Sequence, residues 1–415
     1  HRPPRPRRTL SNLGIALRTR YERTGQVTDL DDAINTGQAA VDTTPTDHPD
    51  RAGYLSNLGI ALRTRYERTG QVTDLDDAIE VYRKGVGVAG ASPQTRALAA
   101  RGWGQTAAGG GRWEEAVAGF TAATELLGLL APRSLARHDQ EALLVEFGGL
   151  GADAAACCVQ AGQVGQAVAL FEQGRGVLLG QALDMRTDLT ALNQRYPNLA
   201  ASFVRLRDVL DQADGPAVPD QLQPGQGAVD ATVAQRQAAG VALEELIASI
   251  RRLDGFETFL QPPPLEDLLA TAAEGPVVAV AVSEFGSQAL LLADSTVEAV
   301  ALPDLTPQAV YDQVVAFLGA LADTTSGVAQ RRLVAVLGWL WDVLAGPVLD
   351  RLHLTTTPAD GPSWPRLWWC TTGLLSFLPV HAAGHHDTRF DTHPATVLDR
   401  TISSYTPTLR ALTHA

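Results

Sequence analysis

The chain has 415 residues, 45 % of them hydrophobic and 19 % charged, which is the composition of a protein with a substantial core. Its net charge of −13 argues against a general nucleic-acid binder, because such proteins neutralise phosphates with a basic face. Three cysteines make no disulfide framework, so we expect a reducing, cytoplasmic setting.

Residues 1–9 form a basic arm rich in arginine and proline, without the apolar stretch of a signal peptide behind it. Further on, no apolar run reaches the roughly 18 residues that span a bilayer. The nearest candidate, Leu333–Leu349, contains Asp342 and Pro347. We therefore expect no membrane segment. Because there is no initiating methionine, we also expect a piece of a longer protein.

A verbatim repeat dominates the N-terminal part. Leu10–Ile34 and Leu55–Ile79 are the same 25 letters at an offset of 45 residues. Self-similarity at a period of about 20–50 residues is typical of stacked repeat architectures. Apolar residues at helical spacing on both sides of Gly70 predict a helix hairpin that must bury its apolar face on a neighbour. Gly70 is expected to end the first helix, and Thr73 with Asp76 to form a capping box for the second.

The second copy resembles the tetratricopeptide repeat, a pair of packed helices of about 34 residues. The resemblance is carried by Leu55, Leu58, Gly59 and Leu62 on the first helix and by Ala78 and Tyr82 on the second. Small residues at Gly59 and Ala78 allow the helices to approach closely. Their separation is longer than in the family, which fits a longer first helix.

Two diverged copies follow the identical pair. The third has Trp103, Gly104, Ala107, Ala116, Phe120 and Ala123, and the fourth has Ala154, Ala155, Cys158, Ala167 and Phe171. We thus expect a helical solenoid of about four repeats within residues 10–212. In the fourth copy, Cys157 and Cys158 are interpreted as small core residues rather than as a redox or metal site.

The repeats are expected to bind a protein or peptide partner, since solenoids use extended concave surfaces for binding. The first helix of the second copy points four residues toward that side: Ser56, Ile60, Arg63 and Thr64. These are the predicted partner-binding residues. The alternatives are that the arginines are merely solvated, and that a recent duplication preserves the letters without functional demand.

Beyond the repeats, residues 213–228 predict a linker, because prolines and glycines occur there without apolar periodicity, and residues 229–261 regain helical character. Over residues 262–415 apolar strand runs alternate with helical patterns, which predicts a layered α/β domain with a mostly parallel sheet. The expected strands are Val277–Val282, Gln288–Ala293, Val297–Leu302 and Arg366–Cys370, and the expected helices are about Pro307–Ala322 and Arg331–Leu352.

Four segments give this second half and the helices before it a resemblance to the CHAT domain, a caspase-like fold that bacteria join to tetratricopeptide arrays. They are Glu172–Leu179, Phe256–Leu269, Leu378–Gly384 and Ser403–Leu412. The implied fold class is α + α/β, an N-terminal tetratricopeptide-like α-solenoid followed by the leading part of a caspase-like α/β domain. Lys84 is the one lysine, and this bias agrees with a bacterial, actinobacterial source.

The resemblance implies a signalling or defence cysteine peptidase, in which a histidine base activates a cysteine thiolate. The family's H-x-x-C-H-G-like and S-A-C-like segments do not occur in these 415 residues, so no catalytic residue is assigned and the chain is expected to be inactive alone. Cys370 and His381 are not interpreted as a dyad, because Cys370 lies on a buried strand. No metal or cofactor is expected. The alternatives are a non-catalytic interaction scaffold and, more weakly, a zinc hydrolase built on the loop His381–His393.

Overall fold

The computed structural model describes residues 6–127, 129, 146–183, 187–211, 226–260, 264–359 and 364–414. Its contacts divide the chain into two compact units, one of residues 1–141 and 180–261 and one of residues 142–179 and 262–415. The division after residue 261 falls where the α/β domain was expected to begin. Most of the expected linker 213–228 lies outside the described residues, as do residues 1–5 of the basic arm.

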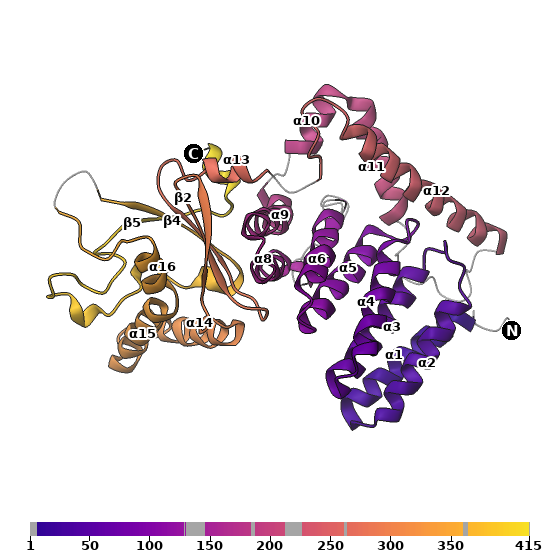
Figure 1. Cartoon of the computed structure of the whole chain (residues 1–415), viewed down its shortest axis with the longest axis horizontal. Coiled ribbons are helices and arrows are strands. Elements are labelled where there is room, and N and C mark those ends of the chain that lie inside the picture. The colour runs from indigo at the N-terminus through magenta and orange to yellow at the C-terminus, as the bar shows by residue number, and fades with distance from the viewer. Residues whose placement is uncertain are drawn as a thin grey trace. The chain divides into compact units, whose positions relative to one another are not determined.

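The first unit is helical in its described residues, and it begins with three consecutive helix pairs (Figure 1). The pairs are α1 (Pro6–Thr24) with α2 (Val27–Asp42), α3 (Arg51–Thr69) with α4 (Val72–Val86), and α5 (Pro93–Gly109) with α6 (Trp113–Leu127). Three further helices follow: α10 (Thr187–Arg195), α11 (Pro197–Asp211) and α12 (Gln226–Ile250). The expected third repeat is therefore a helix pair, α5 with α6.

The turn inside the second pair is only partly as predicted. Gly70 ends α3 in the left-handed conformation, with φ 71°, and its N–H donates to the Tyr66 carbonyl, which confirms the predicted C-cap. The predicted capping box was wrong, because α4 begins at Val72 and Gln71 occupies the cap position without a side-chain bond. Thr73 thus lies inside the first turn.

Large side chains of one helix fit against glycines of the next in these pairs. A Cβ atom added at Gly59 would lie 2.7 Å from Tyr82 Cζ, and one added at Gly102 would lie 2.5 Å from Tyr82 Cε1. The Tyr82 ring therefore fills the space between α3 and α5, which explains why the first helix of the repeat needs a small residue. Gly104 and Phe120 make the same kind of contact in the third pair.

The second unit contains a five-stranded sheet with the strand order β3-β2-β1-β4-β5. The strands are β1 (Val277–Ala281), β2 (Gln288–Ala293), β3 (Thr296–Ala301), β4 (Arg366–Thr371) and β5 (Ile402–Tyr405). β1 pairs with β4 and β4 with β5 in parallel, whereas β1–β2 and β2–β3 are antiparallel. The sheet is mixed, so the expectation of a mostly parallel sheet was wrong. Short turns join β1, β2 and β3, and such turns permit only antiparallel pairing.

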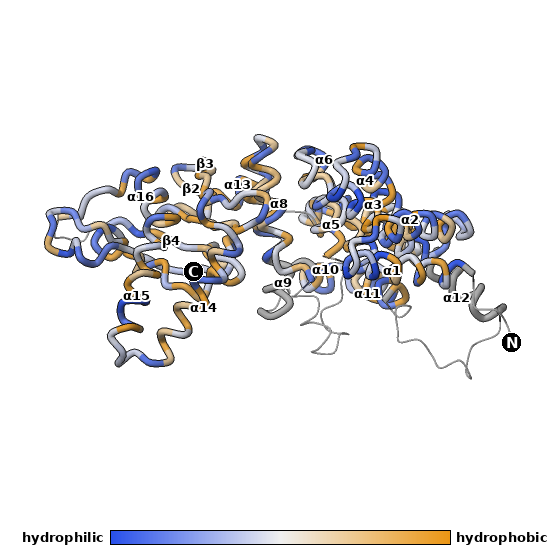
Figure 2. Tube along the Cα trace, turned by 90° about the horizontal axis from the view of Figure 1, so that it is seen from below, coloured by the Kyte–Doolittle hydropathy of each residue, from blue (hydrophilic) through white to orange (hydrophobic). Residues whose placement is uncertain are grey.

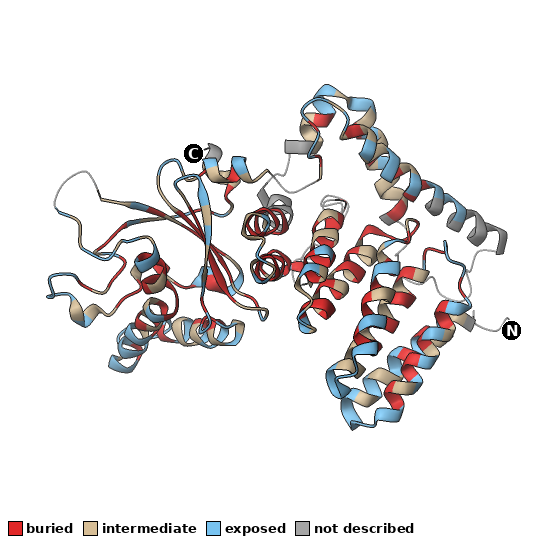
Figure 3. Cartoon of the chain, in the orientation of Figure 1, coloured by how far each residue is buried: buried red, intermediate tan, exposed pale blue. Residues whose placement is uncertain are grey.

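Helices cover both faces of this sheet. One layer is α14 (Pro307–Leu321), α15 (Gly327–Leu340) and α16 (Gly346–Arg351), whose buried residues share a core with Val278, Val280 and Trp369. The other layer contains α8 (Leu150–Gln160) and α9 (Val164–Leu183), the helices of the expected fourth repeat. Figure 3 shows most of the described residues of both as buried. This helix pair therefore completes the α/β unit. A short helix, α13 (Leu265–Ala270), precedes β1.

One helical run in this unit, Gly327–Arg351, is long and apolar enough to cross a membrane by length and composition. However, 44 % of its apolar window is buried inside the protein, and Leu340, Leu344 and Val348 belong to the core beneath the sheet. Apolar residues also recur along the neighbouring α14 (Figure 2). The run has the features of a core helix, so it is weak evidence for a membrane span.

Candidate functional sites

The predicted partner-binding residues lie together on one stripe of α3, and all four are half-buried. The Ser56 hydroxyl donates to the Ala52 carbonyl and the Thr64 hydroxyl to the Ile60 carbonyl, so both hydroxyls are engaged within their own helix. Arg63 forms an ion pair with Glu67 at 3.4 Å. The two hydroxyls are thus engaged within α3, and Glu67 balances the charge of Arg63.

Arg63 also connects α3 to the next repeat, because its Nη1 donates to Gln105 Oε1 on α5 at 3.4 Å. α3 packs beside α1 on one side and α5 on the other. The first helices of the three pairs therefore lie next to one another, and the stripe of α3 lies between the corresponding surfaces of α1 and α5.

A buried carboxylate anchors the two helices of each identical repeat. Arg65 binds Asp74 through two bonds, Nε–Oδ2 at 2.8 Å and Nη2–Oδ1 at 2.6 Å, and its Nη1 reaches Asp31 of the preceding repeat at 2.9 Å. Arg20 binds Asp29 in the same bidentate way. The hydrogen bond from Arg20 lowers the pKa of Asp29 below its usual value. Sequence reasoning missed these pairs, although both residues recur at the repeat's offset.

In the second unit, α9 is bonded to the chain that follows β5. The Glu172 carboxylate is almost fully buried and accepts hydrogen bonds from the Leu409 and Arg410 N–H groups at 2.8 and 3.0 Å. Arg175, one turn further along α9, donates to the carbonyls of Thr371 and Pro407. Two of the four segments singled out in the sequence, Glu172–Leu179 and Ser403–Leu412, thus meet at the carboxyl ends of β4 and β5.

A third segment joins the same place. The Tyr405 hydroxyl accepts a hydrogen bond from the His381 N–H at 3.0 Å and lies 3.0 Å from His381 Nδ1. Burial raises the pKa of Tyr405. The fourth segment, Phe256–Leu269, does not converge with the others: the rings of Phe256 and Phe259 pack edge to face in the first unit, and α13 lies in the second.

None of the three cysteines has the surroundings of a nucleophile. All are fully buried and free. Burial raises the pKa of Cys158 and of Cys370 to about 12 and raises that of Cys157 further. A thiolate is the reactive form of cysteine, so these groups are inert near neutral pH. This agrees with the interpretation of Cys157 and Cys158 as core residues and of Cys370 as a buried strand residue.

The loop His381–His393 does not gather metal ligands. Within the described residues no three His, Cys, Asp or Glu side chains are placed to hold a metal ion. The His385 Nε2 instead lies 2.8 Å from Asp342 Oδ1 on the helical run, and the His386 Nε2 bonds the Ala382 carbonyl.

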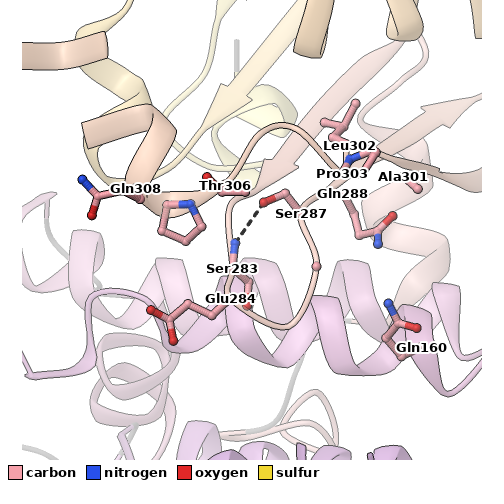
Figure 4. A pocket seen from close by; sticks show the side chains of 12 residues that line it. Gln160, Ser283, Glu284, Ser287, Gln288, Ala301, Leu302, Pro303, Thr306 and Gln308 are labelled. Atoms are coloured by element: carbon pink, nitrogen blue, oxygen red, sulfur yellow. Dashed lines mark hydrogen bonds between the residues drawn. The ribbon is translucent and has the colours of Figure 1, made fainter. Parts of the chain in front are cut away.

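A hollow of about 470 Å³ lies beside the loop after β1 (Figure 4). Its hydroxyls are already engaged: Ser287 accepts from the Ser283 N–H and donates to the Leu305 carbonyl, and Ser283 donates to Asp153 of α8. No histidine lines the hollow. Glu284 is the one ionisable side chain among its lining residues, and both serine hydroxyls are engaged elsewhere, so the hollow assembles no nucleophile–base pair.

Comparison with known families identifies the first two helix pairs. Residues 7–50 and 51–91 each match the model of the tetratricopeptide repeat. No curated protein matches the chain. The matched residues coincide with α1–α2 and α3–α4, so the N-terminal region consists of tetratricopeptide-type repeats, a kind of repeat that generally mediates protein–protein interactions.

Proposed function

We propose that this protein binds a protein or peptide partner through the surface that α1, α3 and α5 present, with the stripe of Ser56, Ile60, Arg63 and Thr64 at its centre. The observation that carries the proposal is the match of two consecutive helix pairs to a repeat used in protein recognition. The half-buried stripe adds a preformed surface whose side chains lose little freedom on binding.

The partner is expected to be a peptide segment that covers Ile60 and bonds Arg63. The Arg63 side chain is only partly exposed and is held by Glu67 and Gln105, so it can direct its remaining N–H groups without further ordering. A solenoid surface of this kind recognises extended chain or helix rather than a small molecule.

Site-specific photo-crosslinking in cells tests this proposal. A benzoylphenylalanine at Ile60 should give a discrete crosslinked species, whereas one at Val72, an exposed residue of α4, should not. Thr64→Arg, which fills the stripe, should abolish the crosslink while leaving the helical circular dichroism intact. Equal crosslinking from both positions, or crosslinking that survives Thr64→Arg, would contradict the proposal.

A second proposal concerns the α/β unit, which we propose to be the leading part of a caspase-like CHAT domain belonging to a signalling or defence peptidase in the bacterial cytoplasm. The convergence of three family-like segments around Glu172, Arg175 and Tyr405 supports it. Cys370 cannot supply the nucleophile, because its raised pKa keeps the thiol protonated. The purified chain should therefore cleave no peptide substrate, and turnover lost in Cys370→Ala would overturn this assignment.

A further inference from the structure

Gln288 carries a carboxamide at a buried position of the sheet. Ala289 and Leu291 of β2 belong to the core beneath α14 and α15. Because successive side chains of a strand alternate, Gln288 points to the opposite face, the face that α8 and α9 cover. Leu290 shares that face and is fully buried, and Gln288 itself is 5 % exposed. Buried amides are normally bonded, but among the described residues no hydrogen bond engages this side chain.

A second carboxamide lies close to the first. Gln160, the last residue of α8, is exposed, and its side chain likewise has no hydrogen-bond partner in the described part of the chain. A Cβ atom added at Gly286, in the loop between β1 and β2, would lie 3.2 Å from Gln160 Nε2 and 3.6 Å from Gln288 Nε2. Both side chains line the hollow beside this loop (Figure 4). One point beside Gly286 is therefore within reach of two unpaired carboxamides from two different elements.

Other polar side chains of the hollow are already bonded. Gln308 donates to Asp312 Oδ1 at 2.9 Å, and the Thr306 hydroxyl accepts from the Ala309 N–H as the cap of α14. The two serine hydroxyls are engaged as well. The carboxamides are thus the groups that remain to bond a ligand.

The rest of the lining restricts the charge and the shape of that ligand. Glu284 carries the one charge among the lining residues, so an anion is disfavoured. Leu302, Pro303 and Pro307 provide apolar surface. The volume of about 470 Å³ is in the range of small-molecule sites. A small, neutral and partly apolar compound fits these conditions.

We propose that the hollow binds a neutral ring compound that carries an amide, with the amide beside Gly286 between Gln160 and Gln288. A carboxamide both donates and accepts, so each glutamine can bond the N–H and the C=O of a ligand amide. A carboxylate only accepts, and it would add a second negative charge near Glu284. This site belongs to the second unit, so the proposal is independent of the partner-binding surface proposed for α3.

Saturation-transfer NMR on the purified full chain tests the proposal with a matched pair of probes. Nicotinamide and nicotinate have the same ring and differ only in the amide and the carboxylate. Nicotinamide should receive saturation from the protein, and nicotinate should not. Equal transfer to both probes, or none to nicotinamide, would overturn the proposal. Stronger transfer to N-acetylglycinamide, which has amides but no ring, would assign the hollow to a peptide segment and refute the ring ligand.

Two substitutions locate the bound probe. Gln160→Leu changes an exposed side chain, and Gln288→Met keeps the length of a buried one. Each should weaken nicotinamide binding by at least about tenfold in a titration, because a pair of hydrogen bonds is lost. Gln330→Leu is the matched control, since Gln330 is an exposed glutamine of α15 that does not line the hollow, and it should leave the affinity unchanged. Binding that survives both substitutions in the hollow would contradict the proposal.

Thermal unfolding of the ligand-free protein gives an independent readout. Because Gln288 buries its carboxamide without a hydrogen bond, Gln288→Met should keep or raise Tm while it loses nicotinamide binding. The loss of binding is then not a loss of the fold. A clearly lower Tm would show that the carboxamide is already satisfied within the protein, and its role as a ligand group would be refuted.

Discussion

The identical repeats permit one substitution to be made twice in the same local sequence. Leu58→Ala removes a side chain that is 1 % exposed, and Leu13→Ala removes one that is 48 % exposed. Truncating a fully buried leucine costs about 3–5 kcal/mol, because the lost transfer energy is increased by a cavity. The half-exposed leucine loses roughly 1 kcal/mol or less, since water already reaches it and no cavity forms. The helix propensities of the two sites are equal and cancel.

Thermal unfolding followed by far-ultraviolet circular dichroism checks this difference. For a unit of this size each kcal/mol shifts Tm by about 2–4 °C, so Leu58→Ala should lower Tm by about 6–20 °C and Leu13→Ala by no more than about 4 °C. Equal shifts would refute the reasoning, because they would mean that α1 and α3 have the same surroundings. A larger effect at Leu13 would show that another part of the protein covers Leu13 in the folded state.

Three further predictions rest on individual contacts. Gly59→Ala should cost about 1–3 kcal/mol in urea unfolding, because the new Cβ would meet the Tyr82 ring at 2.7 Å, and Tyr82→Leu should recover part of the loss. Asp29 has a lowered pKa in the folded state, so its contribution to stability is complete above the ordinary value near 4 and is lost as the pH falls through the folded pKa. Asp29→Asn should therefore weaken the fall in the free energy of unfolding at low pH. An unchanged pH dependence would contradict the pairing of Asp29 with arginine. Cys370 should resist a thiol reagent in the native protein and react fully in denaturant, and rapid native labelling would show that the strand is not buried.

Local signals in the sequence were sufficient to predict the helix pairs and most of the strands. Gly70 ends α3 as predicted because only a residue without a Cβ adopts its positive φ easily. The strand β1 agrees within one residue with its continuous apolar run. The predicted capping box at Thr73 was wrong because α4 begins at Val72. Thr73 therefore lies inside the helix, and Gln71 occupies the cap position.

Contacts between distant residues could not be read in this way. Nothing near Glu172 indicates that its carboxylate caps the turn after β5, since its partners are backbone groups more than two hundred positions away. The packing partners of α8 and α9 could not be predicted locally either. Their small residues are equally compatible with a repeat, but in the structure they pack in the α/β unit.

The repeated sequence by itself determined that α1 and α3 are helices with the same apolar residues at the same helical positions, because periodicity and turn residues act over a few positions. Only the tertiary structure decided that Leu58 is buried on α3 and that Leu13 is exposed on α1. Burial is a property of neighbours, and the packing of α2 against α3 is what makes one leucine core and leaves its identical copy on the surface.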